Sequence, residues 1–277
     1  MDTAPDNTES QEEVLQKTLG TGARIDYMLG RIRDALRNGQ MNLLSEYLDK
    51  TDTELQKGGD WERKNKLSVY RAMASIIRRD FVTASHLLIR ALATFTPCDL
   101  LTFRDFVFYT VVSSMLTQDR VVIKTKVLGS PEILSVVREV PHLLPVLTGL
   151  QECRYQDFFV HFADLIDVIR CDTFLSKHLR YITKTLRMVA YRQFMMAYTS
   201  VTLDSMASSF GISVDFLEGD IFDFIRAGKL KCKIDKMNRY IESNRLEDKR
   251  NPSYMSILRH GDQLLNRVQN LSRVIDV

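Results

Sequence analysis

The chain has 277 residues, of which 45% are hydrophobic and 26% are charged, and its formal net charge at pH 7 is +3. These values are typical of a globular protein; they exclude a largely disordered chain, and so small a net charge gives no argument for nucleic acid or an anionic membrane as a partner. The length exceeds the usual size of a single compact core, so we expect two packed units or one elongated repeat array.

The first 22 residues are polar and acidic, with little apolar surface to offset the entropy lost on ordering. We therefore predict a disordered tail over residues 1–22. Its composition is unlike that of a signal peptide, and no apolar stretch approaches the roughly 20 residues of a membrane-spanning helix. These features predict a protein of the cytoplasm and nucleus without membrane contact.

From Ala23 onward, apolar residues recur at the three- and four-residue spacings of amphipathic helices. Residues 23–60 predict an antiparallel helix pair, the remnant of an N-terminal helical repeat. Asp60 is placed to cap the next helix, which opens at Trp61, and the polar step at residues 78–80 introduces its partner. This second pair resembles one unit of a tetratricopeptide-like solenoid. Small residues would let its two helices approach closely: Ala74, Ala84 and Ala91.

A comparable helix, turn and helix recur further on, with apolar residues at positions 143–150 and 158–169. Between the two pairs, residues 103–116 predict a strongly apolar, buried helix. A lone helical unit cannot bury its apolar face without stacked neighbours, so helical repeats are expected over residues 61–200. Cys153 and Cys171 flank apolar positions and are predicted to be small core residues.

The pattern of residues 201–244 is typical of a winged helix, which a long amphipathic helix over residues 177–199 precedes. Thr202 and Ser213 are placed to cap two helices on either side of a turn at Gly211, which is the spacing of a helix-turn-helix. A period of two then follows, which predicts a small hairpin of strands around residue 232 and at residues 239–242.

The winged helix favours a protein partner over DNA. Its second helix is acidic, and phosphates would be repelled along most of its face. The wing is basic, so a nucleic-acid-binding winged-helix protein remains the alternative to a protein that binds other proteins. Lys231 and Lys233 occupy outward positions of an alternating strand, where charge discourages unwanted strand pairing, and we predict a partner-binding edge there. Arg226 is the basic residue of this second helix, and its acidic residues are Asp215, Glu218, Asp220 and Asp223.

Residues 245–277 predict a linker and a C-terminal assembly helix. Past Asn251-Pro252, apolar residues follow a heptad pattern, which is typical of a helix that packs against a partner helix. The predicted partner-binding seam consists of Ile257, Leu264, Val268, Leu271 and Ile275.

Nothing in the sequence predicts catalysis. Nucleotide-binding, zinc-protease and nucleophile-elbow motifs are absent, and Gly20-Thr21-Gly22 is only a fragment of a dinucleotide-binding motif. His161 and Asp164 have the spacing of a base and its orienting group, but such a pair on an amphipathic helix is usually a surface contact. Without a C-x-x-C pair or ligand-spaced histidines, we expect no catalytic residue, no cofactor and no metal site.

Several short stretches resemble one family, the PCI-type subunit of the proteasome lid known as regulatory-particle non-ATPase subunit seven. The resemblance covers residues 23–277. Its longest stretch lies in the terminal helix, and shorter ones precede it: Gly261-Asp-Gln-Leu-Leu-Asn-Arg-Val-Gln-Asn-Leu-Ser-Arg-Val-Ile275, Cys232-Lys-Ile-Asp235, Ile241-Glu-Ser-Asn-Arg245, Gly58-Gly-Asp-Trp-Glu-Arg-Lys-Asn65, Arg79-Asp-Phe81, Thr94-Phe-Thr96 and Glu152-Cys-Arg-Tyr155.

The resemblance implies a mainly α protein, in which a tetratricopeptide-like solenoid precedes a winged-helix module and a C-terminal helix, with a PCI domain over residues 61–244. It implies a non-catalytic scaffold that supports ubiquitin-dependent degradation, with other lid subunits as partners and the ATPase ring as a further candidate. Family members usually carry more helical repeats ahead of Ala23, where this chain has its acidic tail. The equivalent subunit of the COP9 signalosome shares the architecture and is the alternative within this class.

Overall fold

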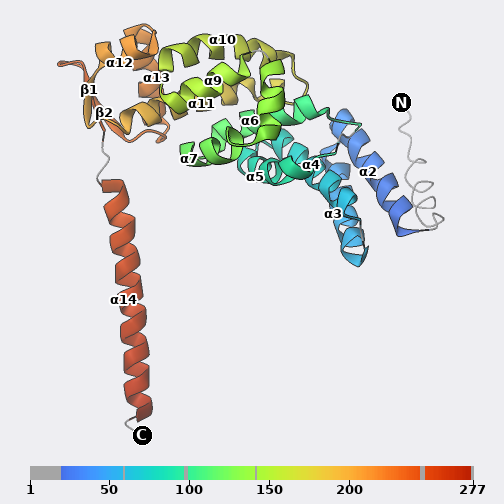
Figure 1. Ribbon diagram of the computed structural model, residues 1–277. Helices are drawn as coiled ribbons and strands as arrows, with labels where there is room; N and C mark the ends of the chain where they lie inside the picture. Colours follow the sequence, from blue (N-terminus) through green and yellow to red (C-terminus); the bar gives the residue numbers. More distant parts are fainter. Residues whose placement is uncertain (1–19, 59, 97–98, 141, 244–246, 276–277) are drawn as a thin grey trace, which may run out of the picture. The chain divides into compact units, whose positions relative to one another are not determined.

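The computed structural model describes residues 20–58, 60–96, 99–140, 142–243 and 247–275 (Figure 1). The chain divides into two compact units, Met1–Leu186 and Arg187–Val277, which are described separately below. Most of the expected tail, residues 1–19, lies outside the described residues. The first helix begins at Thr21 rather than Ala23.

The first unit is built from helices, and its successive antiparallel pairs follow one another as the apolar periodicity predicts (Figure 1). Helix α2 packs against α3, α4 against α5, and α9 against α10. Between α6 and α9 the chain forms a series of short helical segments that the sequence did not predict. The helices are α2 (Thr21–Asn38), α3 (Met41–Gly58), α4 (Trp61–Ile77), α5 (Phe81–Ala91), α6 (Phe103–Thr117), α7 (Arg120–Val122), α8 (Pro131–Val136), α9 (Leu143–Glu152) and α10 (Tyr155–Cys171).

Each of these three helix pairs turns through one residue in the left-handed backbone region. The residue is Gly39 between α2 and α3, Arg79 between α4 and α5, and Cys153 between α9 and α10, with φ of 71°, 65° and 62°. A left-handed residue lets the chain reverse directly after a helix, because its N–H can bond back to the last turn. Cys153 is therefore an exposed helix cap, and Cys171 is exposed as well, so their prediction as core residues is wrong.

The core of the first unit centres on α6, which is buried on all sides from Phe106 to Leu116. The predicted buried helix is thus confirmed. Thr102 and Asp105 form a reciprocal capping box at its start. At its other end, Thr117 donates a hydrogen bond to Ser85 of α5.

Gly149 lets α9 and α10 approach closely. A Cβ built at this position would lie 3.2 Å from both the Cβ and the backbone nitrogen of Phe158, and backbone cannot move aside cheaply. We expect Gly149→Val to lower the free energy of unfolding of the first unit by about 2 kcal/mol. Gly30→Val in α2 is the control, because a Cβ there meets no atom within 4 Å in the described part of the chain. Urea denaturation followed by the fluorescence of Trp61, the single tryptophan, measures both; equal losses would contradict the prediction.

Side chains that are far apart in the sequence connect α4 and α5 to the segment after α10. The ring of Phe81 stacks on Tyr181, with centroids 5.7 Å apart, and meets His178 edge-on at 5.9 Å. His178 Nε2 lies 3.1 Å from the carbonyl oxygen of Ile77, and the guanidinium of Arg79 lies over the Tyr181 ring at 5.2 Å. The first unit is therefore held together by these long-range side-chain contacts as well as by the stacking of neighbouring helix pairs.

The second unit contains the predicted winged helix. Helix α11 (Leu179–Met195) crosses the division between the units and is followed by α12 (Leu203–Phe210) and α13 (Val214–Arg226). Thr202 caps α12 as predicted, because its side chain accepts a hydrogen bond from the N–H of Ser205. Ser213 occupies the N-cap position of α13 as predicted, but its side chain makes no capping hydrogen bond to the described residues.

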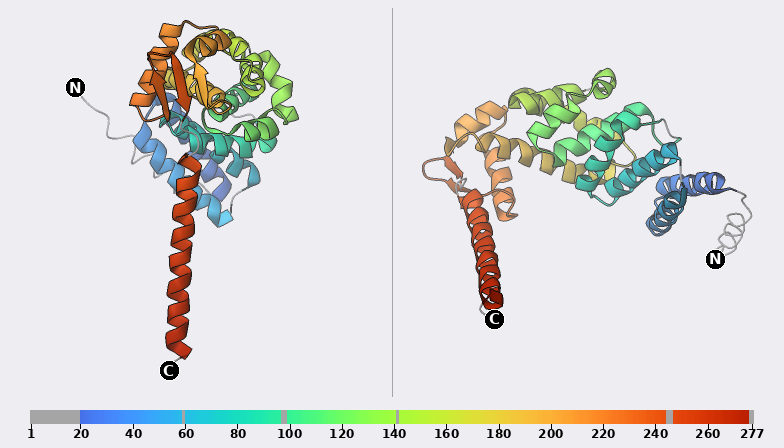
Figure 2. Two further views of the ribbon diagram at one scale, coloured as in Figure 1. Left: turned by 90° about the vertical axis from the view of Figure 1, so that its left-hand side faces the viewer. Right: turned by 60° about the horizontal axis from the view of Figure 1, so that its bottom comes forward.

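The wing is part of a three-stranded antiparallel sheet with the order β1-β3-β2, seen as adjacent arrows in the left view of Figure 2. The strands are β1 (Ser200–Thr202), β2 (Cys232–Asp235) and β3 (Tyr240–Ser243). The predicted hairpin corresponds to β2 and β3. The strand β1 was not predicted. The long helix ends at Met195 instead of residue 199, and Ser200–Thr202, beyond the predicted helix, pair with β3.

The aromatic core of this unit joins α11 to α12 and α13. The ring of Phe210 meets Tyr191 at 5.1 Å and Phe194 at 5.3 Å, and Tyr191 also contacts Phe224 at 6.2 Å. Edge-on aromatic pairs of this kind add to the free energy of area burial. The core therefore fixes both helices of the helix-turn-helix against the end of α11.

The last helix, α14 (Glu247–Ile275), is longer than expected, because it begins before Pro252 rather than after it. Its bounds still contain the whole predicted seam. Among the described residues, no helix combines the length and the apolar character needed to cross a membrane.

Candidate assembly surfaces

The predicted seam lies on an exposed face of α14. All described side chains from Ser253 to Ile275 are exposed, and the five seam residues are 60–74% exposed. In a helix of 3.6 residues per turn, the spacings between them place all five on one stripe. Such a row of large apolar side chains is unusual on a protein surface unless a partner covers it. The seam is accordingly the first candidate assembly surface: Ile257, Leu264, Val268, Leu271 and Ile275.

Gly261 has no side chain, and the gap that it leaves beside this stripe is called the hollow below. Its neighbours three and four positions away include Ile257, Leu258, Leu264 and Leu265, all exposed. A Cβ built at Gly261 would meet no atom of the described residues within 4 Å, so no close contact among them requires glycine there. Glycine in a helix interior costs about 1 kcal/mol relative to alanine. Such a hollow between four large apolar side chains resembles the holes that receive a side chain of the partner in helix-to-helix packing.

The second candidate surface is the outer edge of the wing, defined by Lys231 and Lys233. Both side chains are exposed while Cys232 between them is buried, so the alternation predicted from the sequence is confirmed. The strand β2 pairs with β3 through one edge, and the sheet order places it at the outside. Lys233 stands opposite Glu242 in the register, a pairing of unlike charges.

The acidic helix α13 is less acidic on its surface than the sequence indicates. Asp220 is largely buried and accepts a hydrogen bond from Arg187 Nη1 of α11 at 2.5 Å, with side-chain exposures of 14% and 15%. Tyr191 adds a longer bond to the same carboxylate at 3.4 Å. Burial, followed by the charge of Asp220, raises the pKa of Tyr191 above its usual range. Asp220 is therefore part of the packing of α11 on α13 and not of a phosphate-repelling face.

A second acidic residue of α13 is paired with the wing. Glu218 forms an ion pair with Lys236, in which Nζ and Oε1 lie 2.8 Å apart, and the hydrogen bond that the lysine donates raises its pKa. Asp215 and Asp223 lie on exposed positions of the helix. These two exposed carboxylates would still repel phosphates from part of the helix.

The cysteines differ sharply in their surroundings. Burial raises the pKa of the Cys232 thiol to about 11, whereas Cys153 and Cys171 are exposed; Cys98 lies outside the described residues. At pH 8, far below that pKa, Cys232 stays protonated, and only the thiolate reacts. We expect iodoacetamide to modify Cys153 and Cys171 about 100-fold faster than Cys232. Peptide mass spectrometry over time measures this, and similar rates for Cys153 and Cys232 would contradict it.

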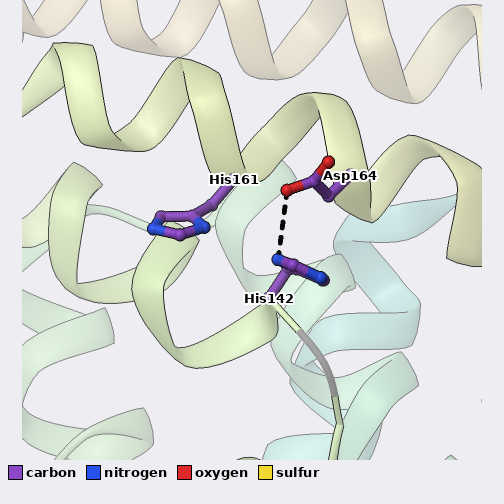
Figure 3. A group of neighbouring side chains, drawn as sticks. All are labelled: His142, His161 and Asp164. Atoms are coloured by element: carbon purple, nitrogen blue, oxygen red, sulfur yellow. Dashed lines mark ion pairs between the residues drawn. The ribbon is translucent and has the colours of Figure 1, made fainter.

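Three polar side chains lie near one another in the first unit, and the sequence had paired only two of them. His142 Nδ1 lies 3.2 Å from Asp164 Oδ2, and the rings of His142 and His161 have centroids 5.8 Å apart (Figure 3). The sequence presented His161 and Asp164 as a pair on α10. The fold adds His142, which immediately precedes α9 and which no spacing rule would have found.

Comparisons with known proteins match three parts of the chain. The family model described as 26S proteasome subunit RPN7 matches residues 6–126, and that of the PCI domain matches residues 162–245. The model described as the 26S proteasome regulatory subunit RPN7/PSMD6 C-terminal helix matches residues 254–275. This last match contains the whole seam of α14.

Relatives cover nearly the whole chain. It is 42% identical to the 26S proteasome non-ATPase regulatory subunit 6 of Oryza sativa subsp. japonica over 261 residues, which are 94% of this chain and 67% of that protein. It is 36% identical to the 26S proteasome regulatory subunit rpn7 of Schizosaccharomyces pombe over 268 residues, 95% of this chain and 67% of the relative. The COP9 signalosome complex subunit 1 of Arabidopsis thaliana is a weaker match, 24% identical over 160 residues, which are 58% of this chain and 36% of that protein. The chain spans about two thirds of the length of the first two.

Proposed function

This chain belongs to the 26S proteasome subunit RPN7 family, and from that membership we propose that it is a non-catalytic structural subunit of the lid of the proteasome regulatory particle. In this role it supports ubiquitin-dependent degradation by contacts with other lid subunits, in the cytoplasm and nucleus. The COP9 signalosome alternative is weaker, because identity falls from 42% to 24% and the matched part of this chain from 94% to 58%.

The exposed apolar stripe of α14 is the observation that carries the proposal. Five large apolar side chains face outward along one helix, and the same residues fall within the match to the C-terminal helix of the family. If apolar helices of neighbouring subunits cover the stripe, each Å² of apolar surface removed from water stabilises the complex by about 25 cal/mol. The hollow at Gly261 supports close helix-to-helix packing in particular.

A scaffold role also suits the rest of the chain. We take the helical repeats and the winged helix, residues 61–244, as a PCI domain that presents the wing edge to a neighbouring subunit. The outer position of β2 would allow a strand or loop of the neighbour to lie against it. The proposal assigns no catalytic residue to this chain.

The wing edge has a measurable consequence. We expect Lys231→Glu with Lys233→Glu to reduce incorporation into the lid about tenfold, since a reversed charge changes the fit at an interface and places Glu opposite Glu242. Lys124→Glu with Lys126→Glu, two exposed positions of the first unit, changes net charge equally and serves as the control. Co-purification of lid subunits with each tagged variant provides the measurement. Equal losses in the two double variants would remove the wing edge from the proposal.

Affinity purification of the tagged chain from its own cells, followed by mass spectrometry, tests the function itself. The expected result is enrichment of proteasome lid subunits together with the ATPase ring. Enrichment of signalosome subunits instead would transfer the chain to that complex. Absence of lid and ATPase subunits in a preparation where the chain is intact would overturn the assignment.

A further inference from the structure

The cluster of His142, His161 and Asp164 in the first unit is not used by the proposed scaffold role. Each side chain offers one possible ligand atom, and these atoms lie within 4.8 Å of one another. His142 immediately precedes α9, while His161 and Asp164 lie on neighbouring turns of α10. We propose that the three residues form a binding site for a zinc ion.

The separations suit a single ion. Zinc bonds of about 2.0–2.2 Å to nitrogen and oxygen place tetrahedral ligand atoms roughly 3.4 Å apart. His142 Nδ1 and Asp164 Oδ2 are already 3.2 Å apart, at the distance of two ligands on one ion. The side chains of His142 and Asp164 are 38% and 52% exposed, so they have room to rotate toward His161, and all three ligand atoms already lie within 4.8 Å of one another. Neighbouring turns of one helix hold two of the ligands in a fixed relation.

His161 supplies an independent observation. Its Nδ1 atom is buried and has no hydrogen-bond partner among the described residues. A buried polar atom without a partner costs free energy, which a bound ion or a tightened contact would recover. Figure 3 shows one ring nitrogen of His161 on the side of the His142–Asp164 pair, from which a shared ion would approach.

The donor set selects the class of metal. Two imidazoles and a carboxylate suit zinc, whereas calcium and magnesium prefer oxygen ligands alone. Three protein ligands leave the fourth position to water, which the exposure of His142 and Asp164 permits. The backbone of His142 is in the left-handed region, with φ of 63°, so the bound ion would tie this strained residue to α10. The site is thus a clamp between the start of α9 and the middle of α10.

Zinc titration of the untagged full chain after chelator treatment tests the site, by calorimetry and by thermal unfolding. The expected results are equimolar binding and a rise in Tm of about 5 °C when free zinc is one hundred times Kd. His142→Ala and His161→Ala should each weaken binding about 100-fold. His86→Ala, at an exposed position of α5, should bind as the wild type does.

Two further variants make every outcome decisive. Cys153→Ser with Cys171→Ser should bind zinc normally, and cobalt bound in place of zinc should show visible bands without thiolate charge transfer, because no thiol belongs to the site. Asp164→Asn conserves the shape of the side chain and should also weaken zinc binding. It keeps the test valid if circular dichroism shows that the histidine variants are unfolded. Absence of equimolar binding, loss of binding in the cysteine variant, or unchanged affinity in Asp164→Asn would each overturn the proposal.

Discussion

Leu264→Asp with Leu271→Asp is expected to abolish incorporation of the chain into the lid while both compact units stay folded. The two leucines lie on the apolar stripe of α14 and are 60% exposed in the isolated chain, so the change removes no internal packing. In an assembled helix bundle each is worth about 2 kcal/mol of burial, and a carboxylate there would be desolvated without a partner. Together they should weaken association at least a thousandfold.

Gln263→Asp with Asn270→Asp is the matched control for this prediction. It adds the same charge to the same helix at the same seven-residue spacing, but on the face away from the stripe. Glycerol-gradient sedimentation of cell extracts separates the free chain from the lid. The control should travel with the lid and the leucine variant should not. If the leucine variant sedimented normally, α14 would have lost the role given to its seam.

Asp220→Ala is expected to destabilise the second unit by about 3 kcal/mol. Removing one partner of a buried ion pair leaves the other charge without compensation, and Arg187 is only 15% exposed. The variant also removes one acceptor of the Tyr191 hydroxyl. Because the single tryptophan lies in the first unit, hydrogen exchange measured by mass spectrometry is the suitable method. Peptides of α13 should exchange faster, and peptides of α6 should not change.

Two variants separate the pair from a general effect of lost charge. Asp215→Ala changes an exposed carboxylate in the first turn of the same helix and should cost less than about 1 kcal/mol. Arg187→Met with Asp220→Leu replaces both charges by apolar groups and should recover most of the lost stability. If Asp220→Ala behaved like Asp215→Ala, the pair would contribute little to the packing of α11 on α13.

The sequence predicted the parts of the fold that depend on local periodicity. Apolar residues three and four positions apart determine which face of a helix can be buried, and the helix pairs of the first unit follow them. The cap at Thr202 and the buried Cys232 between exposed lysines likewise need only neighbouring residues. The predictions failed where a local pattern had two outcomes. Cys153 could be core or cap, and the left-handed turn made it an exposed cap.

The stripe on α14 was fully determined by the sequence, because both its composition and its helical spacing are local. What only the tertiary structure decided are contacts between side chains distant along the chain. The apparent surface charge of Asp220 became a buried pair with Arg187, and His142 came to lie 3.2 Å from Asp164. Such contacts depend on how helices stack, since packing brings together residues that no periodicity relates.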